Sequence, residues 1–196
     1  MHGTEIATNK YMFNKDGRLI QVSALVYRYK DNKPYLLLIT SRGTKRWIIP
    51  KGWPIPGRSL AQSALKESFE EAGVRGVVST TAIGHYSYIK VEDLALSQKV
   101  HTNLHLLTAK EPGLLSPFAV NNYTLTPTDI TTKKEVASPL NIPIHVYIFP
   151  VFYSHQEKKW PEHGQRIYEW VCPKQAAERV REPELKAILR NYSPQY

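Results

Sequence analysis

Three acidic side chains, Glu67, Glu70 and Glu71, lie close together near the end of one amphipathic segment. At about 100° per residue, their i,i+3 and i,i+4 spacings place the three carboxylates on one face of a helix. Like charges at those spacings destabilise a helix by roughly 0.2–0.5 kcal/mol per pair, and the helix dipole disfavours anions in the last turns. The cluster therefore indicates a site for a hard divalent cation such as Mg²⁺, with a solvated acidic face as the alternative.

The helix that carries these glutamates has clear limits in the sequence. Ser59 and Gln62 have the spacing of a capping box, in which each side chain satisfies a backbone N–H at the start of the helix. Gly73 suits the left-handed position that follows a helix. We therefore expect a helix over about 60–72, with Ser63 on the acidic face. The side predicted to pack on the core consists of Ala61, Leu65, Phe69 and Ala72.

The stretch 52–74 resembles the Nudix box, whose pattern is G-x5-E-x7-R-E-U-x-E-E-x-G-U, with U an aliphatic residue. The positions that match are Gly52, Glu67, Glu70, Glu71, Gly73 and Val74. Lys66 stands where the family has arginine, and Ser68 where it has an aliphatic residue. Arg58 stands where the family has glutamate, which reverses a charge. The resemblance implies a Nudix hydrolase, an enzyme that cleaves an organic diphosphate linked to a further moiety.

The resemblance also implies roles for individual residues. It assigns catalysis to Glu67, Glu70, Glu71 and Lys66, and it implies a Mg²⁺ or Mn²⁺ cofactor held by the three glutamates and the Gly52 carbonyl. One glutamate would act as general base on the attacking water, and the sequence leaves open which one. The family often adds an acid from a late loop, for which the candidates are Glu135, Glu157 and Glu162.

Arg58 cannot form the pair that the family makes between the loop glutamate and the box arginine, because Lys66 is also positive. Two alternatives for bracing this loop stay open. Either another acid serves, or the loop is held by the packing of Trp53, Pro54 and Pro56.

Basic side chains precede the box, in the segment SRGTKRWIIPKGW. Guanidinium groups bind phosphate through two parallel hydrogen bonds. The residues predicted to bind substrate phosphates are Arg42, Arg46, Lys51 and Arg58, with a solvated basic turn as the alternative. The segment is similar to that of diphosphoinositol polyphosphate phosphohydrolases and diadenosine polyphosphate hydrolases. This resemblance implies an anionic polyphosphate small molecule as the substrate.

Two other functions remain as alternatives. The net charge of +9 favours anionic partners in general, so an RNA 5′-pyrophosphohydrolase is one of them. A non-catalytic Nudix-like module that binds nucleotides or RNA is the other, and the clustered glutamates argue against it. His101 and His105 are expected to be incidental despite their i,i+4 spacing. Four strand tyrosines are expected to serve sheet packing rather than base stacking: Tyr86, Tyr88, Tyr147 and Tyr153.

The composition suits one globular domain over residues 1–196, with 42% hydrophobic residues. No apolar run reaches 18 residues, so we expect no membrane-spanning helix. The single cysteine, Cys172, and the polar start of the chain favour a cytoplasmic protein.

The elements that must position the glutamates are mostly strands. We expect strands over 19–29, 34–40, 47–50, 74–89 (with a break at Gly84), 144–153 and 166–171, helices over 175–181 and 184–190, and an irregular insertion at about 92–142. Strands around one helix, with helices at the end of the chain, predict an α+β fold, an α/β/α sandwich with a mixed sheet. The Nudix resemblance implies the same architecture.

Overall fold

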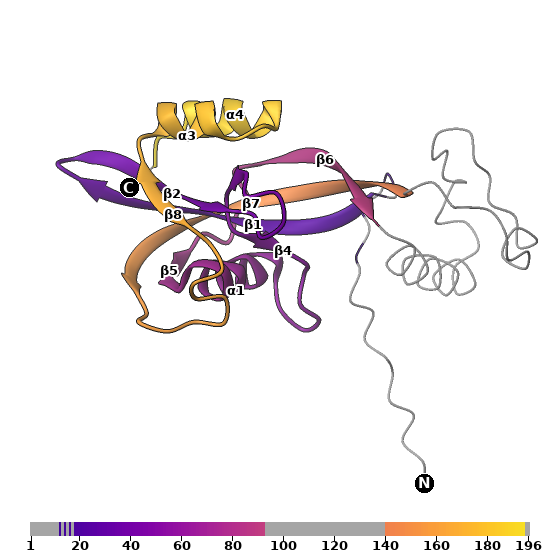
Figure 1. Ribbon diagram of the computed structural model, residues 1–196, viewed down its shortest axis with the longest axis horizontal. Helices are drawn as coiled ribbons and strands as arrows, with labels where there is room; N and C mark the ends of the chain where they lie inside the picture. The colour runs from indigo at the N-terminus through magenta and orange to yellow at the C-terminus, as the bar shows by residue number, and fades with distance from the viewer. Residues whose placement is uncertain (1–11, 13, 15, 17, 93–139, 195–196) are drawn as a thin grey trace, which may run out of the picture.

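A single mixed sheet forms the centre of the molecule (Figure 1). The computed structural model describes residues 12, 14, 16, 18–92 and 140–194. The strands are β1 (Leu19–Lys30), β2 (Lys33–Thr40), β3 (Trp47–Ile48), β4 (Lys51–Gly52), β5 (Val74–Val78), β6 (Gly84–Glu92), β7 (Leu140–Gln156) and β8 (Tyr168–Val171). Their order is β3-β2-β1-β7-β5, while β4 pairs with β1, β6 with β7 and β8 with β2. β1 and β7 run parallel, and the other pairings are antiparallel.

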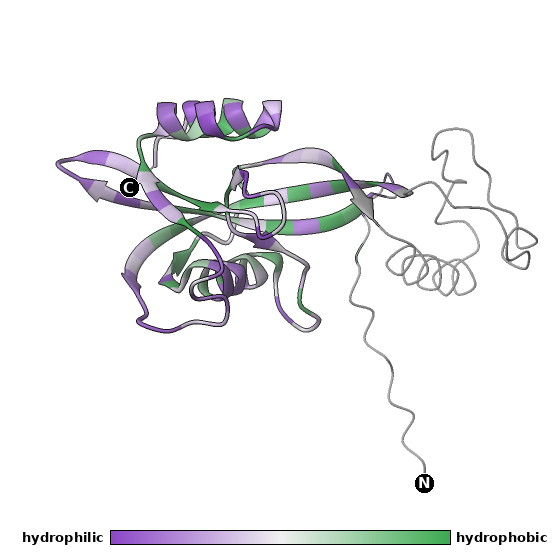
Figure 2. Cartoon of the chain, in the orientation of Figure 1, coloured by the Kyte–Doolittle hydropathy of each residue, from purple (hydrophilic) through white to green (hydrophobic). Residues whose placement is uncertain are grey.

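Helices cover both faces of this sheet, which confirms the predicted α/β/α sandwich (Figure 1). Helix α1 (Leu60–Ala72) lies on one face, and α3 (Pro173–Arg179) and α4 (Pro183–Arg190) lie on the other. The first eight residues of β1 are all buried, as expected for a strand enclosed on both sides. Figure 2 shows the same arrangement as hydrophobic central strands with hydrophilic residues on the outer side of α3 and α4.

Two apolar layers hold the helices against the sheet. Under α4, Tyr86 of β6 packs with Leu185 and Leu189 in one buried cluster. Under α1, Ala61 and Ala64 pack with the apolar side chains of β1 and β7. The small alanines let α1 approach the sheet closely, so the residues of α1 and β4 come into direct contact.

Most predicted elements appear with shifted ends. The first two strands form a hairpin whose turn residues, Asp31 and Asn32, have φ of 51° and 57°, the conformation of a tight two-residue turn. Of the predicted strand 47–50 only Trp47–Ile48 is a strand, and β4 follows at Lys51–Gly52. The segment 74–89 divides into β5 and β6. The expected irregular insertion is bounded by Glu92 in β6 and Leu140 in β7, and 93–139 lies outside the described residues.

Helix α1 has the predicted limits, but its buried face is rotated from the predicted one. The Ser59 and Gln62 capping box is present, and Gly73 follows the helix with φ of 69°. Phe69 was expected in the core but is only half-buried, and the Arg75 guanidinium lies 3.8 Å from its ring centroid. The buried residues of the helix are Ala61, Ser63, Ala64, Ser68, Glu71 and Ala72. Burial of Glu71 brings one of the three acids into the interior.

None of the helices in the described part of the chain is long and apolar enough to cross a membrane.

Candidate active site

Glu67 faces the backbone of β4. A Cβ atom on Gly52 would lie 2.2 Å from the carboxyl carbon of Glu67 and 2.3 and 2.4 Å from its two oxygens. Only glycine leaves room for the carboxylate at this position, so the first glycine of the box has a steric role. The Glu67 carboxylate therefore lies beside Gly52, the residue whose carbonyl is also predicted to bind the metal.

The Glu67 carboxylate has no directly bound positive partner among the described residues, and the nearby charge of Lys66 only partly opposes the rise of its pKa. Burial raises its pKa to about 7, and repulsion from Glu71 and Glu70 adds to the shift. Among the described residues, no hydrogen bond or ion pair to this carboxylate is found. Such a group gains from a bound cation, and a carboxyl with a pKa near 7 is also suited to proton transfer at neutral pH.

Glu71 is held at both of its oxygens. The backbone N–H of Lys51 donates to Oε2 at 2.9 Å, and the guanidinium of Arg166 donates to Oε1. Both side chains of this ion pair are more than nine-tenths buried. Burial raises the pKa of Glu71, and Arg166 and the Lys51 N–H oppose that shift. Glu71 therefore connects the end of α1 with β4 and with the segment before β8.

Glu70 lies on the outer side of the same turn and pairs with Lys66. Both side chains are about one-third exposed. Lys66, which stands at the arginine position of the Nudix box, thus pairs with an acid of its own helix at the favourable i,i+4 spacing.

The end of α1 is capped by the connection between β7 and β8. Three of its last carbonyls accept hydrogen bonds: Ala72 from the Gln156 side chain at 2.8 Å, Gly73 from the Glu157 N–H at 2.9 Å and Glu70 from the Glu162 N–H at 3.0 Å. These donors satisfy carbonyls that a helix end leaves unpaired and oppose the dipole that disfavours acids there. Capping by a distant segment explains how the helix tolerates Glu70 and Glu71.

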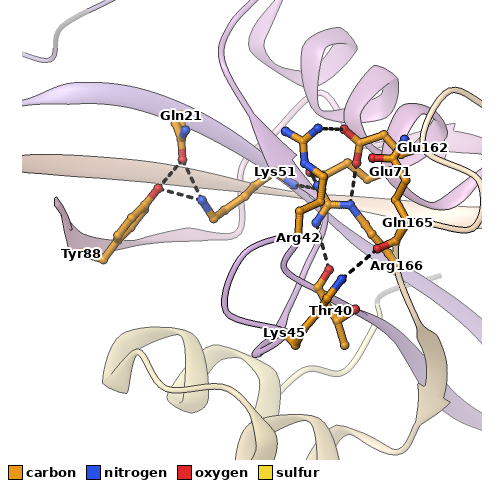
Figure 3. A network of polar contacts seen from close by, with 10 residues as sticks. All are labelled: Gln21, Thr40, Arg42, Lys45, Lys51, Glu71, Tyr88, Glu162, Gln165 and Arg166. Atoms are coloured by element: carbon orange, nitrogen blue, oxygen red, sulfur yellow. Dashed lines mark hydrogen bonds and ion pairs between the residues drawn. The ribbon is translucent and has the colours of Figure 1, made fainter. Parts of the chain in front are cut away.

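Glu162, one of the three late-loop acids considered from the sequence, lies near Glu67 and Glu71. It accepts from Arg166 Nε at 2.6 Å and pairs with Arg42 at 3.2 Å (Figure 3). Glu157 instead pairs with Arg75 on the surface. Glu135 lies outside the described residues, as do His101 and His105.

Lys51 points to the opposite side of the sheet from α1. Its Nζ donates to Gln21 Oε1 at 3.0 Å and to the Tyr88 hydroxyl at 2.7 Å, and it lies 4.5 Å from the centroid of the Tyr88 ring (Figure 3). Burial lowers the pKa of Lys51 to about 8. Tyr88 therefore has a polar role that its strand pattern did not indicate, whereas Tyr86 is fully buried.

The other predicted phosphate-binding residues differ in their surroundings. Arg46 pairs with the buried Glu182 next to the Tyr88 ring, while Arg42 is largely exposed. Arg58 is exposed and forms no ion pair within the described part of the chain. The structure thus brings Lys51 and Arg46 near the Tyr88 ring, and places Arg42 and Arg58 at the surface.

The loop between β4 and α1 is braced without an acid partner for Arg58. Pro54 is buried, and Trp53 packs against the core. Ser63 accepts the Ile55 N–H at 3.0 Å and donates to the Ser59 carbonyl at 3.0 Å. Packing of Trp53 and Pro54 and a helix serine therefore hold the loop, which agrees with the second alternative except that Pro56 is exposed.

The donor set fits a hard divalent cation, although it is not gathered around one point. In the described ranges, no group of three or more His, Cys, Asp or Glu is placed to share an ion. The oxygens on offer are those of Glu67, Glu70, Glu71 and the Gly52 carbonyl, and Mg²⁺ and Mn²⁺ favour such ligands. The Glu67 carboxylate has no competing partner among the described residues. Glu71 accepts one hydrogen bond at each oxygen, so an ionised Glu71 keeps further lone pairs for a cation.

A second polar group lies away from these acids. His145 of β7 stacks on His85 of β6 with ring centroids 4.3 Å apart, and its Nδ1 lies 3.4 Å from Ser87 Oγ. Burial lowers the pKa of His145, and the nearby His85 and Arg18 lower it further, against a smaller effect of Asp16.

Four side chains of the polar networks were not predicted from the sequence: Gln21, Tyr88, Arg166 and Glu182. Gln21 had a usable signal, since it is a polar residue inside a strand that is otherwise apolar and buried on both faces. Arg166 had none, because 95 positions separate it from Glu71.

The architecture is the Nudix fold. No protein-family model matches the chain. A Nudix hydrolase structure from Nitrosomonas europaea superposes with a TM-score of 0.50 at 14% identity, covering 88% of this chain and 86% of that one. At this identity the likeness shows the fold alone.

In sequence the chain is similar to Nudix hydrolases, as the box resemblance predicted. Diphosphoinositol polyphosphate phosphohydrolase 3-beta of Bos taurus is 34% identical over 64 residues, which cover 33% of this chain and 39% of the relative. Nudix hydrolase 21, chloroplastic, of Arabidopsis thaliana is 24% identical over 185 residues, which cover 92% of this chain and 69% of the relative. The chain thus matches about two-fifths of the length of its diphosphoinositol relatives.

Proposed function

We propose that the protein is a divalent-metal-dependent hydrolase that cleaves a diphosphate linkage in a polyphosphorylated small molecule. The observation that carries the proposal is the contact of Glu67 with Gly52. A half-buried carboxylate without a partner lies against Gly52, where any Cβ atom would displace it. The similarity to Nudix hydrolases supports the same reaction class.

The metal would be held by the carboxylates of Glu67, Glu70 and Glu71 with the Gly52 carbonyl. A bound Mg²⁺ or Mn²⁺ supplies neutralisation of the negative charge on the reacting phosphates. Of the three acids, Glu67 is best placed to take the proton of the attacking water, because Glu70 and Glu71 are already paired with Lys66 and Arg166.

The residues proposed to bind the substrate are basic and lie beside an aromatic ring. Lys51 and Arg46 lie beside the Tyr88 ring, on the side of the sheet that α4 covers, and are suited to phosphate oxygens. Lys51 is linked to the acidic side through its own backbone, which donates to Glu71. Only the Lys51 backbone lies against the acids, because its Nζ bonds Gln21 and Tyr88 on the other side of the sheet. The substrate classes favoured by this charge are dinucleoside polyphosphates and diphosphoinositol polyphosphates.

A phosphate-release assay tests the proposal. The purified protein is incubated with diadenosine polyphosphates, diphosphoinositol polyphosphates, nucleoside triphosphates and 5′-triphosphorylated RNA, each with Mg²⁺, with Mn²⁺ and with chelator. We expect metal-dependent release from one of the small-molecule classes. Turnover of RNA alone would favour the RNA pyrophosphohydrolase, and RNA retention on a filter without any turnover would favour a binding module.

The matched variants are Glu67→Gln and Glu178→Gln. Glu67→Gln removes the unpaired carboxylate and should lower kcat by at least about a hundredfold, in line with the loss of a general base. Glu178 is exposed on α3, and Glu178→Gln should leave kcat unchanged. Full activity of a folded Glu67→Gln protein would refute the assignment of the site.

A further inference from the structure

Arg166 binds three separate groups that belong to three different parts of the fold (Figure 3). Its Nε donates to Glu162 Oε2 at 2.6 Å, its Nη1 donates to the Thr40 carbonyl at 2.9 Å, and its Nη2 donates to Glu71 Oε1. The side chain is only 6% exposed. All three nitrogens of the guanidinium are therefore used, and the side chain has no freedom to turn toward solvent.

These contacts hold Glu71 without covering it completely. The Lys51 N–H occupies one site on Oε2, and Arg166 occupies one site on Oε1. An ionised carboxylate offers about four acceptor sites, so about two remain for a cation. Arg166 thus sets where the remaining acceptor sites of Glu71 point.

The usual internal brace of the box is missing from this chain. Lys66, at the arginine position, pairs with Glu70, and Arg58, at the glutamate position, is exposed. The positive partner of Glu71 is not a residue of the box but Arg166, which precedes β8. A lysine could not replace it fully, because an ammonium is a point donor and the three acceptors are spread around a planar fork.

We propose that Arg166 is a positioning residue, which holds Glu71 for divalent-metal binding. Glu162 anchors the guanidinium from the other side and is itself tied to the end of α1 through its N–H bond to the Glu70 carbonyl. This inference rests on the proposed function, since it assumes that Glu71 binds the metal.

The test compares Arg166→Lys and Arg166→Gln with the wild-type protein at low temperature, after circular dichroism has shown that each variant is folded. Mn²⁺ affinity is measured by isothermal titration calorimetry without substrate, and kcat and KM are measured at saturating metal. Loss of a partner that orients a metal ligand typically costs 10–100-fold in affinity or activity. We expect about tenfold weaker Mn²⁺ binding for Arg166→Lys and a larger loss for Arg166→Gln, with kcat reduced and the substrate KM unchanged.

Arg179→Lys is the control. Arg179 is likewise an arginine paired with a glutamate, Glu169, through two hydrogen bonds, but this pair lies at the surface between α3 and β8. Its replacement should change neither Mn²⁺ affinity nor kcat.

The outcomes separate the two proposals. A wild-type protein that binds Mn²⁺ and turns over substrate, with folded Arg166 variants that match it in both, overturns the role of Arg166 alone. A wild-type protein that binds no Mn²⁺ and turns over nothing overturns the proposed function, and the role of Arg166 with it. A lowered Tm in variants that are folded at low temperature and keep wild-type Mn²⁺ affinity and kcat would show that Arg166 serves stability only.

Discussion

The contact between Gly52 and Glu67 makes Gly52→Ala a sharp test of the site. The added Cβ would lie 2.2 Å from the carboxyl carbon of Glu67, whereas carbon atoms are comfortable at about 3.5–4.0 Å. The carboxylate must therefore retreat by more than about 1 Å. A displacement of about 1 Å at a reacting group costs on the order of a hundredfold in rate. We expect kcat to fall by about that factor.

The same change should affect folding only slightly. The atoms that the new methyl group meets are the end of a flexible side chain, which can rotate away. An off-rotamer side chain costs about 0.5–1.5 kcal/mol, and replacing glycine by alanine returns about 0.4–1 kcal/mol through the unfolded chain. The free energy of unfolding should therefore change by less than about 1 kcal/mol, which corresponds to a shift in Tm of at most about 4 °C.

The assay pairs steady-state kinetics with thermal unfolding, and Gly43→Ala is the control. Nothing lies within 4 Å of a Cβ at Gly43, so this variant should keep both activity and Tm. Wild-type kcat in Gly52→Ala would show that the position of Glu67 does not matter for the reaction. A collapse of Tm would show that Gly52 is required by the fold instead.

Three further substitutions address stability. Gly73→Ala places a side chain at φ of 69° and at 2.4 Å from the Trp160 ring, and should lower the free energy of unfolding by about 2 kcal/mol in thermal melts. Glu71→Gln leaves Arg166 buried with one charged partner fewer, so urea unfolding should show a loss of about 3 kcal/mol. His145→Asn should weaken the acid sensitivity of the fold: the native state lowers the pKa of His145 below 6.5, so the unfolded chain binds the proton first and stability is lost as the pH falls below about 6.5.

Each of these predictions has its own comparison. Gly57→Ala has the same unfavourable backbone (φ of 77°) but open space around it, so it should cost less than Gly73→Ala. Glu169→Gln breaks a surface pair and should leave the urea midpoint unchanged, unlike Glu71→Gln. For His145, urea unfolding at pH 7.5 and 5.5 would contradict the reasoning if the variant and the wild-type protein lost stability equally.

Much of helix α1 could be predicted from the sequence, because the signals that define it are local. The capping box at Ser59 and Gln62 and the left-handed Gly73 depend on neighbours within four residues, and the structure has the helix at the predicted residues. Spacing alone also indicated that the three glutamates share one face near the end of the helix. The strands β1 and β2 were predictable for the same reason, since two apolar runs are separated by the turn residues Asp31 and Asn32.

The arrangement of the site depended on contacts between residues far apart in the chain. The sequence by itself determined that three acids follow a glycine-rich loop, and it predicted a metal site from their mutual repulsion. Only the tertiary structure decided which acid is free and which is paired: Gly52 leaves room for Glu67, while Arg166 reaches Glu71 from 95 positions away. The physical reason is that spacing along a helix fixes which side chains share a face, whereas burial and partners depend on how the sheet brings distant strands together.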